Sequence, residues 1–355
     1  MSGFPRIEVY KGKIRNNCKR TVELCKGYGI EVMAVTKGFC AYPEIAKCLV
    51  EGGATALADS RMANIKKLQH FDVDKVLLRI PMLSELDDVV EYADMVLVSE
   101  METVKALGRK AVQRGTVQRV MAMVDIGDLR EGFWLDDIIP AFGEMLEIKG
   151  IEVAGLGTNL SCYGGVIPRC ENLSALVDYA KEIEKRYGVS LEMISGGNSS
   201  SMHLVFDGGI PEGINNLRIG EAILLGRETV LGIERENYHN DAFVLKAEIV
   251  EVKEKPSIPI GDIGRDAFGN VPVFTDRGVR KRAIIAVGKQ DIQPDTLVPY
   301  DKDIIILGGS SDHTILDISD CNKDYGVGDV LAFDLTYGGM LGGMTSPYVE
   351  KVFLE

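Results

Sequence analysis

The sequence lacks the features that mark several classes of protein. No apolar run approaches the roughly 20 residues that a membrane-spanning helix needs, and residues 1–11 have no apolar core of the kind found in signal peptides. Lys and Arg total 40 against 53 Asp and Glu, for a formal charge of −13, which disfavours a surface that neutralises nucleic-acid phosphates. We therefore expect a cytoplasmic protein that binds neither membranes nor nucleic acid.

Cysteine and histidine are few and are not arranged as metal or disulfide motifs. The seven cysteines are an odd number without a CxxC pair, which predicts free thiols in a reducing compartment. His70, His203 and His239 have no partners at metal-ligand spacing, so we predict no metal site.

What the sequence does have is a regular alternation of short apolar runs and helical patterns. The runs fall at 32–35, 55–58, 75–79, 95–98, 119–125, 151–156, 191–194 and 217–219. Eight strands separated by helices predict a (β/α)8 barrel of the TIM type. A doubly wound open sheet is the alternative, but it usually has a glycine-rich phosphate turn after its first strand, and Lys37-Gly38-Phe39 is no such turn.

The pattern changes near residue 240. Strand-like segments with Gly, Pro and Asp between them, and hardly a helical pattern, then follow at 243–252, 283–287, 304–307, 315–318, 330–333 and 349–353. We therefore predict a barrel over residues 1–235 and a smaller all-β domain over residues 236–355.

Lys37 follows the first predicted barrel strand, at 32–35. Side chains at the C-terminal ends of barrel strands surround the active site, so this amine is expected to face the substrate. A lysine in a partly dry pocket is a base and a nucleophile for Schiff-base formation.

Two later segments are suited to phosphate. The run 195–201 (SGGNSSS) offers backbone N–H groups and hydroxyls, and the run 217–222 (LRIGEA) adds N–H groups beside the guanidinium of Arg218. They follow the seventh and eighth predicted strands, where TIM barrels often bind phosphate. A lysine that forms Schiff bases, combined with a phosphate site, suggests pyridoxal phosphate.

The order of these parts resembles that of the fold-type III pyridoxal phosphate enzymes, the alanine racemase-like group. The resemblance covers nearly the whole length and is carried by VTK (35–37), ADSR (58–61), LRIPM (78–82), VDIGDLREG (124–132), the 195–201 loop, RIGE (218–221), KPS (255–257), DAFGN (266–270) and SSDH (310–313). Each motif alone is weak, but their joint order is specific.

The resemblance implies a role for each site residue. Lys37 would carry the cofactor as a Schiff base, and Arg130 would lie near its ring oxygen. The phosphate would be bound by Asn198, Ser199, Gly220 and the backbone of Glu221, with Tyr337 nearby. Arg218 would face the pyridine nitrogen, and an arginine donates a hydrogen bond there without readily giving up a proton. The ring is then a weaker electron sink, which favours return of the proton to Cα.

Racemisation needs a base on one face of Cα and an acid on the other. By the resemblance Lys37 serves one face, whereas the tyrosine that alanine racemases place on the other face is Lys289 here. The candidates for the second base are His313, Asp312, Lys289 and Tyr337. We predict His313, because histidine ordinarily changes charge near neutral pH.

The resemblance thus predicts a racemase that interconverts L- and D-ornithine by two-base proton transfer. Lysine or another diamino acid is the near alternative, and Glu131, Asp266 and Asp312 are candidates for binding the distal ammonium. The alternatives from other functional classes are a non-catalytic pyridoxal phosphate-binding protein and an aldolase or decarboxylase. The smaller carriers lack a β domain, and an aldolase would need metal ligands there. A homodimer is also implied, with each site completed by the partner's C-terminal domain.

Overall fold

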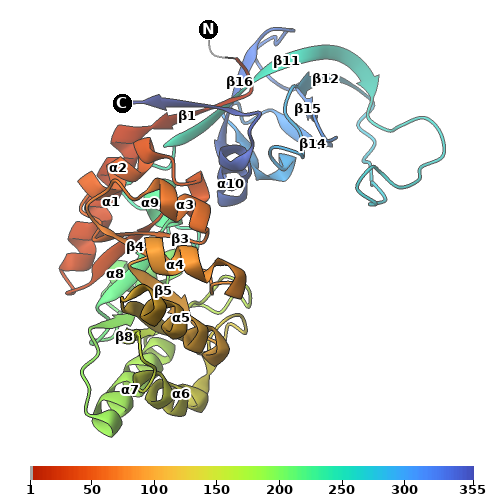
Figure 1. Cartoon of the computed structure of the whole chain (residues 1–355). Coiled ribbons are helices and arrows are strands. Elements are labelled where there is room, and N and C mark those ends of the chain that lie inside the picture. The colour runs from red at the N-terminus through yellow and green to blue at the C-terminus, as the bar shows by residue number, and fades with distance from the viewer. Residues whose placement is uncertain (1–2) are drawn as a thin grey trace. The chain divides into compact units, whose positions relative to one another are not determined.

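The computed structural model describes residues 3–355, which form two compact units. One unit is Lys11–Asn240, and the other joins the N-terminal segment through Tyr10 to Asp241–Glu355. In Figure 1 the first unit runs from red to green along the chain, and most of the second is coloured from green to blue. No helix within residues 3–355 has both the length and the apolar character to cross a lipid bilayer.

The larger unit is a closed barrel of parallel strands. The strand order is β5-β4-β3-β2-β10-β9-β8-β6, and β6 pairs back with β5. The strands are β2 (Glu31–Val35), β3 (Ala56–Asp59), β4 (Asp74–Leu77), β5 (Met95–Val98), β6 (Gln118–Asp125), β8 (Ile151–Gly157), β9 (Met193–Ser195) and β10 (Asn216–Ile219). Each overlaps a run predicted from the sequence, and the predicted (β/α)8 barrel is confirmed.

Helices connect these strands and cover the barrel (Figure 1). They are α1 (Lys11–Lys26), α2 (Pro43–Glu51), α3 (Met62–Lys67), α4 (Leu86–Tyr92), α5 (Met101–Arg114), α6 (Ile138–Leu146), α7 (Cys170–Tyr187), α8 (Met202–Asp207) and α9 (Glu221–Leu224). Short 3-10 helices are η1 (Lys37–Phe39), η2 (Leu83–Glu85), η3 (Leu135–Asp137) and η4 (Ser199–Ser201), and a short strand β7 (Phe133–Trp134) pairs with the end of β6. Gly115 and Gly188 end α5 and α7 in the left-handed conformation that glycine adopts without strain.

Apolar side chains fill the barrel interior. Because alternate residues of a barrel strand point inward, one buried cluster gathers Met33, Val35, Ala56, Ala58, Val76, Met95, Leu97, Met121, Met123, Ala154 and Met193. At Gly155 a Cβ would lie 1.8 Å from the carbonyl oxygen of Met193, so β8 and β9 approach closely only with glycine there. The filled interior leaves the strand ends as the place for a ligand.

The smaller unit is a single sheet. Its order is β13-β16-β11-β12-β15-β14, and β1 pairs with both β11 and β17. The elements are β1 (Arg6–Tyr10), β11 (Phe243–Pro256), β12 (Val279–Ile285), η5 (Pro294–Thr296), β13 (Leu297–Pro299), β14 (Ile305–Gly309), β15 (Thr314–Asp317), β16 (Val330–Leu335), α10 (Tyr337–Thr345) and β17 (Glu350–Leu354). The predicted β-rich architecture is confirmed, with one glycine-rich helix, α10, that the sequence pattern did not indicate.

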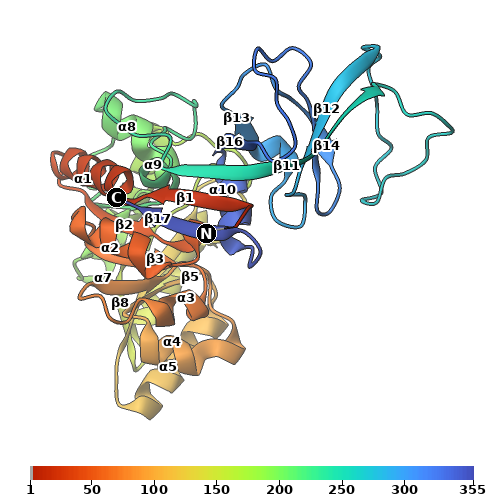
Figure 2. The ribbon, with the colours of Figure 1, turned by 90° about the horizontal axis from the view of Figure 1, so that it is seen from above.

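The N-terminal strand belongs to this sheet. In β1, Val9 lies opposite Phe243 of antiparallel β11 and opposite Phe353 of parallel β17, and Figure 2 shows the three strands side by side. The sequence-based division placed residues 1–10 with the barrel. The structure instead places the described part of that segment in the smaller unit, because β1 is hydrogen-bonded on both edges there and buries Ile7 and Val9 completely.

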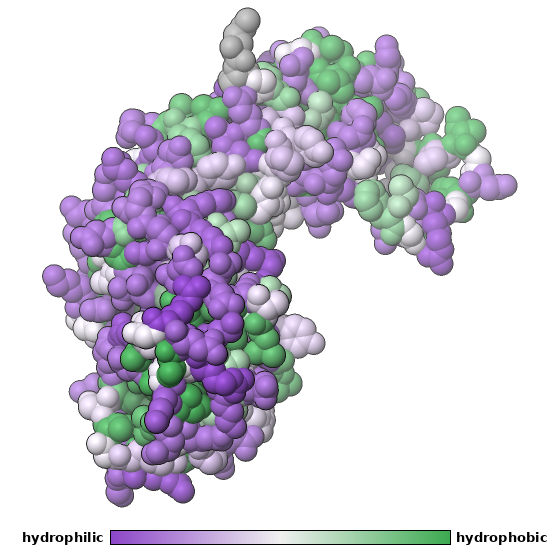
Figure 3. Space-filling model, in the orientation of Figure 1, coloured by the Kyte–Doolittle hydropathy of each residue, from purple (hydrophilic) through white to green (hydrophobic). Residues whose placement is uncertain are grey.

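The connection between β11 and β12 exposes apolar side chains. Ile260 and Val273 are 93% and 94% exposed, and Val271 is 61% exposed. This β11–β12 loop, residues 257–278, extends to the right in Figures 1 and 2, and green and purple surfaces are mixed over it in Figure 3.

Candidate active site

Lys37 begins η1 directly after β2 and Thr36. Its side chain is partly buried, and its Nζ forms no hydrogen bond or ion pair with any residue from 3 to 355. An amine at a strand end without a protein partner is available to a ligand. The structure therefore puts Lys37 where the sequence analysis expected it, at the C-terminal end of the first barrel strand.

A buried carboxylate anchors the turn that leads into Lys37. The hydroxyl of Thr36 donates a 2.6 Å hydrogen bond to Asp59 Oδ2 at the end of β3. Asp59 also accepts from the backbone N–H of Arg61 at 2.9 Å and from Asn64 Nδ2 at 3.1 Å. Burial raises the pKa of Asp59, although the hydrogen bonds from Thr36 and Asn64 oppose this rise. Sequence reasoning noted Asp59 only as a strand-end residue and gave Thr36 no role.

Ser199 and Gly220 meet close to this strand. The neighbouring strand β10 pairs with β2, and a Cβ on Gly220 would lie only 3.1 Å from Val35 Cβ. Ser199 Oγ accepts hydrogen bonds from the backbone N–H groups of Gly220 at 3.2 Å and Ala222 at 3.1 Å. Backbone donors thus converge on one hydroxyl, an arrangement of the type that binds phosphate.

Asn198 ties the 195–201 loop to the segment after β8. Its Oδ1 accepts from the backbone N–H of Ser200 at 2.7 Å, and its Nδ2 donates to the carbonyl oxygen of Leu160 at 2.9 Å and to Asn159 Oδ1 at 3.3 Å. These bonds fix the shape of the loop. The role of Asn198 as a phosphate ligand stays a prediction.

Arg218 lies on β10 and is fully buried. Its Nη1 donates to Ser195 Oγ, and its Nη2 donates to the carbonyl oxygen of Thr158 at 2.5 Å and to Asn159 Oδ1 at 3.1 Å. Burial lowers its pKa to about 10, and the charge of Glu131 opposes this effect. The group is therefore still protonated near neutral pH. Its Nε forms no hydrogen bond with the described residues, so it remains a donor for a ligand.

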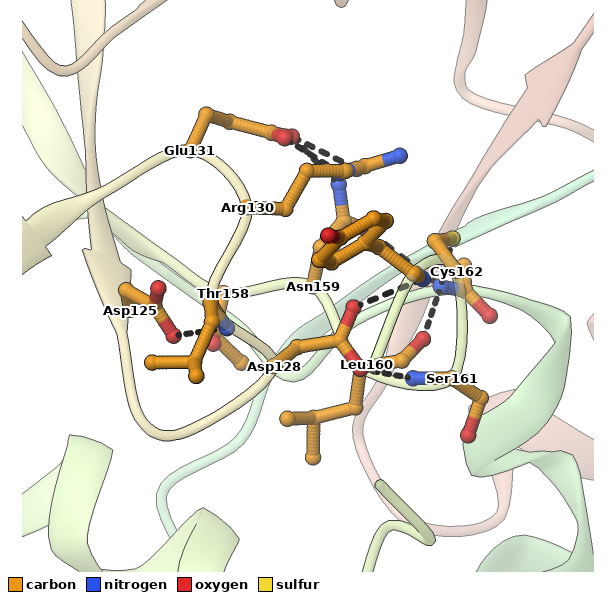
Figure 4. Close-up of polar contacts among 12 residues, drawn as sticks. Asp125, Asp128, Arg130, Glu131, Thr158, Asn159, Leu160, Ser161 and Cys162 are labelled. Carbon is orange, nitrogen blue, oxygen red and sulfur yellow. Dashed lines mark hydrogen bonds and ion pairs between the residues drawn. The ribbon is translucent and has the colours of Figure 1, made fainter. Parts of the chain in front are cut away.

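The loops that follow β6 and β8 meet, as Figure 4 shows. After β6, the neighbouring side chains of Arg130 and Glu131 form an ion pair, and Glu131 Oε1 accepts from Asn159 Nδ2 at 2.9 Å. Buried Asp128 accepts from the backbone N–H groups of Ser161 and Tyr163, both at 3.0 Å. Sequence reasoning assigned no role to Asp128, because its partners are backbone groups that leave no pattern in the sequence.

The remaining predicted site residues belong to the smaller unit. His313 lies in the turn between β14 and β15, where its side chain is 45% exposed and its Nδ1 is 3.2 Å from Asp312 Oδ1. Tyr337 begins α10. Their roles as second base and as phosphate neighbour stay predictions.

Lys289 lies next to the His313 turn. Its backbone N–H donates to the carbonyl oxygen of Ser310 at 2.9 Å. Its Nζ lies 4.0 Å from Asp266 Oδ2 and 4.0 Å from the centroid of the Phe268 ring. Three of the candidate second bases, and two of the candidate carboxylates for a distal ammonium, therefore come from neighbouring segments of one unit.

Comparison with known proteins gives consistent results. The family model for the N-terminal domain of alanine racemase matches residues 9–228. The chain is 48% identical to an ornithine racemase of Acetoanaerobium sticklandii, covering 99% of this chain and 100% of that protein. It is 40% identical to a lysine racemase of Thermotoga maritima, covering 99% and 98%. An alanine racemase structure from Clostridium difficile 630 has a TM-score of 0.76 at 19% identity, covering 100% of this chain and 97% of that one.

Proposed function

The chain belongs to the alanine racemase family, and from that premise we propose that it interconverts L- and D-ornithine. It is a pyridoxal phosphate-dependent amino-acid racemase, as its full-length racemase relatives and its family model indicate. One observation carries the choice of substrate: the relative that is 48% identical over 99% of the chain is an ornithine racemase. The lysine racemase at 40% identity makes lysine the second candidate.

The residues at the barrel mouth fit this cofactor. Lys37 is partly buried and has no side-chain partner among residues 3–355, which suits an aldehyde. Arg218 is fully buried and has an Nε donor that no described residue uses, which suits a pyridine nitrogen. The N–H groups that converge around Ser199 suit a phosphate. We assign Lys37 to the aldehyde and Arg218 to the nitrogen. The phosphate is assigned to Asn198, Ser199, Gly220 and Glu221, with Arg130 near the ring oxygen.

The protein's own residues then carry the proton transfer. When bound at this site, pyridoxal phosphate would supply the electron withdrawal that makes the hydrogen on the substrate Cα acidic. Lys37 Nζ takes or returns the proton on one face of Cα. Arg218 stays protonated near neutral pH. It would donate a hydrogen bond to the ring nitrogen without protonating it, and this would limit charge delocalisation and favour return of the proton to Cα.

We assign the second proton transfer to His313, and we propose a homodimer in which it comes from the partner subunit. All the candidate second bases belong to the smaller unit. The exposed apolar side chains of the β11–β12 loop, such as Ile260 and Val273, favour a surface that another chain covers. A fully active monomer would contradict this assembly.

The substrate's distal ammonium is proposed to bind a carboxylate of the smaller unit. Asp266 and Asp312 have side chains that are 30% and 59% exposed. The pKa values of both lie below the ordinary value because of hydrogen bonds, from the Asn270 backbone in one case and from Ser310 in the other, so both are ionised at neutral pH. We also propose a cytoplasmic location, which is consistent with seven cysteines that are all free.

Incubation of the purified holoenzyme in deuterated water with L-ornithine, L-lysine or L-alanine tests this function. We expect L-ornithine to lose optical rotation and to gain deuterium at Cα faster than the other two. Faster racemisation of lysine would transfer the proposal to the second candidate. Exchange at Cα without loss of rotation would indicate one competent base and contradict the two-base assignment.

A further inference from the structure

Glu131 lies between the two arginines assigned to the cofactor. We propose that it is a positioning residue, whose carboxylate holds the Arg130 guanidinium and orients the Asn159 amide toward Arg218. This inference rests on the proposed function, since it assigns Arg130 and Arg218 to the cofactor ring. It gives Glu131 a role other than binding the substrate's distal ammonium.

The loop that presents Arg130 and Glu131 has a closely defined backbone. Asp125 Oδ1 accepts hydrogen bonds from the backbone N–H groups of Gly127 at 2.8 Å and Leu129 at 3.2 Å. Gly132 has φ of +146°, and a Cβ there would lie 2.2 Å from the backbone nitrogen of Asp125. The loop therefore returns tightly to the end of β6, and Glu131 is held next to the strand end rather than on a free tip.

Both oxygens of the Glu131 carboxylate are occupied. Oε1 accepts from Arg130 Nη2 at 2.6 Å and from Asn159 Nδ2 at 2.9 Å, and Oε2 pairs with Arg130 Nε. Contact with both Nε and Nη2 is the bidentate geometry that gives an arginine a defined orientation. The side chains of Arg130 and Glu131 are 35% and 22% exposed, so the pair stands at the edge of the site.

The bond from Asn159 to Glu131 determines which way the amide faces. Since Nδ2 donates to Glu131, Oδ1 is directed at the opposite side, where it accepts from Arg218 Nη2 at 3.1 Å. A chain of hydrogen bonds thus runs from Arg130 through Glu131 and Asn159 to Arg218. Asp128 anchors the segment after Asn159 independently, through the backbone of Ser161 and Tyr163.

The charges of Arg130 and Arg218 also favour a carboxylate at the position of Glu131. Arg218 is fully buried, and the charge of Arg130 adds to the effect of burial in lowering its pKa, whereas Glu131 raises it. One carboxylate therefore compensates two neighbouring cations. Its oxygens already accept three hydrogen bonds or ion-pair contacts from Arg130 and Asn159, which favours a positioning role for Glu131 over binding of the substrate ammonium.

A titration of the apoenzyme with pyridoxal phosphate tests the proposal without substrate. We expect Glu131→Gln to raise the dissociation constant of the cofactor at least tenfold and to change the absorption spectrum of the bound form. The matched control is Glu171→Gln, which removes the same charge from an exposed position in the first turn of α7 and should change the dissociation constant by less than twofold. Thermal unfolding of the two apoproteins should be alike.

A double-mutant cycle separates positioning from a general structural effect. If Glu131 acts through Arg130, the double variant Arg130→Gln/Glu131→Gln should bind the cofactor within about threefold of the weaker single variant. If the increases in dissociation constant caused by the two single substitutions multiply in the double variant, the proposal is overturned. Glu131→Asp keeps the charge on a shorter side chain and should raise the constant severalfold, so an unchanged constant would overturn it even if Glu131→Gln failed to fold.

These experiments distinguish failure of the proposed function from failure of the role assigned to Glu131. If the wild-type protein takes up no pyridoxal phosphate, the function fails whatever Glu131 does. If the wild-type protein binds the cofactor and racemises ornithine while Glu131→Gln binds it equally well with an unaltered spectrum, only the role of Glu131 fails.

Discussion

The hydroxyl of Thr36 donates a 2.6 Å hydrogen bond to the buried carboxylate of Asp59. Thr36 immediately precedes Lys37, and Asp59 ends the neighbouring strand β3. The bond therefore links the residue before Lys37 to the neighbouring barrel strand. Because the contact is buried, losing it costs more than losing a surface hydrogen bond.

Thr36→Val should reveal this link through the pH dependence of stability. It removes one donor from Asp59, which costs about 1–3 kcal/mol. The pKa of Asp59 is raised by burial and lowered by the Thr36 bond, so the variant raises it further. When the pKa of a carboxyl is higher in the folded state than in the unfolded state, the folded state binds the proton more tightly. The group therefore contributes its full stability below the unfolded pKa, and this contribution is lost as pH rises through the folded pKa. The loss in free energy of unfolding of the variant relative to wild type, measured by urea unfolding, should therefore be larger at pH 8 than at pH 4.

Thr55→Val is the control for that experiment. Its hydroxyl donates to the carbonyl oxygen of Val32 at 3.3 Å and forms no hydrogen bond with a titratable side chain of the described residues. We expect a small loss of stability that is the same at both pH values. A pH-independent deficit for Thr36→Val would contradict the coupling to Asp59.

Ser199→Ala should weaken cofactor binding. It removes the hydroxyl on which the N–H groups of Gly220 and Ala222 converge, and we expect the dissociation constant of pyridoxal phosphate to rise about tenfold, equivalent to about 1.4 kcal/mol. Ser201→Ala is the control, since its hydroxyl donates instead to the carbonyl oxygen of Gly196 at 2.7 Å. Equal titration curves for Ser199→Ala and wild type would remove Ser199 from the phosphate site.

His313→Gln tests the second base. If His313 transfers the proton on the face opposite Lys37, racemisation of L-ornithine and of D-ornithine should each fall at least about 100-fold. Polarimetry from both enantiomers measures this. Unchanged rates in both directions would exclude His313, and Lys289→Gln then examines the neighbouring candidate.

Asp317→Asn should destabilise the smaller unit in a pH-dependent way. Burial alone would raise the pKa of Asp317, but hydrogen bonds from Arg280 Nε at 2.8 Å and from Ser319 outweigh it and lower the pKa. A depressed folded-state pKa contributes stability above the unfolded value, near 4, and that stability is lost as pH falls through the folded pKa. We expect a deficit of about 1–3 kcal/mol at pH 7 that shrinks in acid.

Asp320→Asn supplies the comparison for Asp317. Asp320 pairs with the same arginine, Arg280, but is 61% exposed, whereas the Asp317 side chain is 2% exposed. An exposed ion pair contributes about 0–1 kcal/mol. Equal losses in free energy of unfolding for Asp317→Asn and Asp320→Asn would show that burial does not determine how much each ion pair with Arg280 stabilises the fold.

The barrel could be predicted from the sequence because its strands are apolar runs. Residues such as those of β5 (Met95–Val98) are buried throughout, and strands buried on both faces read as continuous hydrophobic segments. The strand-end positions of Lys37 and Gly220 could be predicted by the same rule. Gly220 directly follows β10, and Lys37 lies two residues after the end of β2.

Other parts could not be predicted because their causes lie far away in the chain. β1 (Arg6–Tyr10) belongs to the smaller unit only through pairing with β11 and β17, more than 200 residues later. α10 (Tyr337–Thr345) is glycine-rich and has no clear apolar stripe. The Glu131–Asn159 contact joins residues 28 positions apart in two loops, and no local sequence pattern predicts such a contact.

Borohydride reduction of the holoenzyme followed by peptide mapping tests the central claim most directly, that Lys37 carries pyridoxal phosphate. We predict a stable pyridoxyl group on the peptide that contains Lys37, and none there in Lys37→Ala. A protein that takes up no chromophore, or a label that forms on another lysine while Lys37 stays unmodified, would contradict the account.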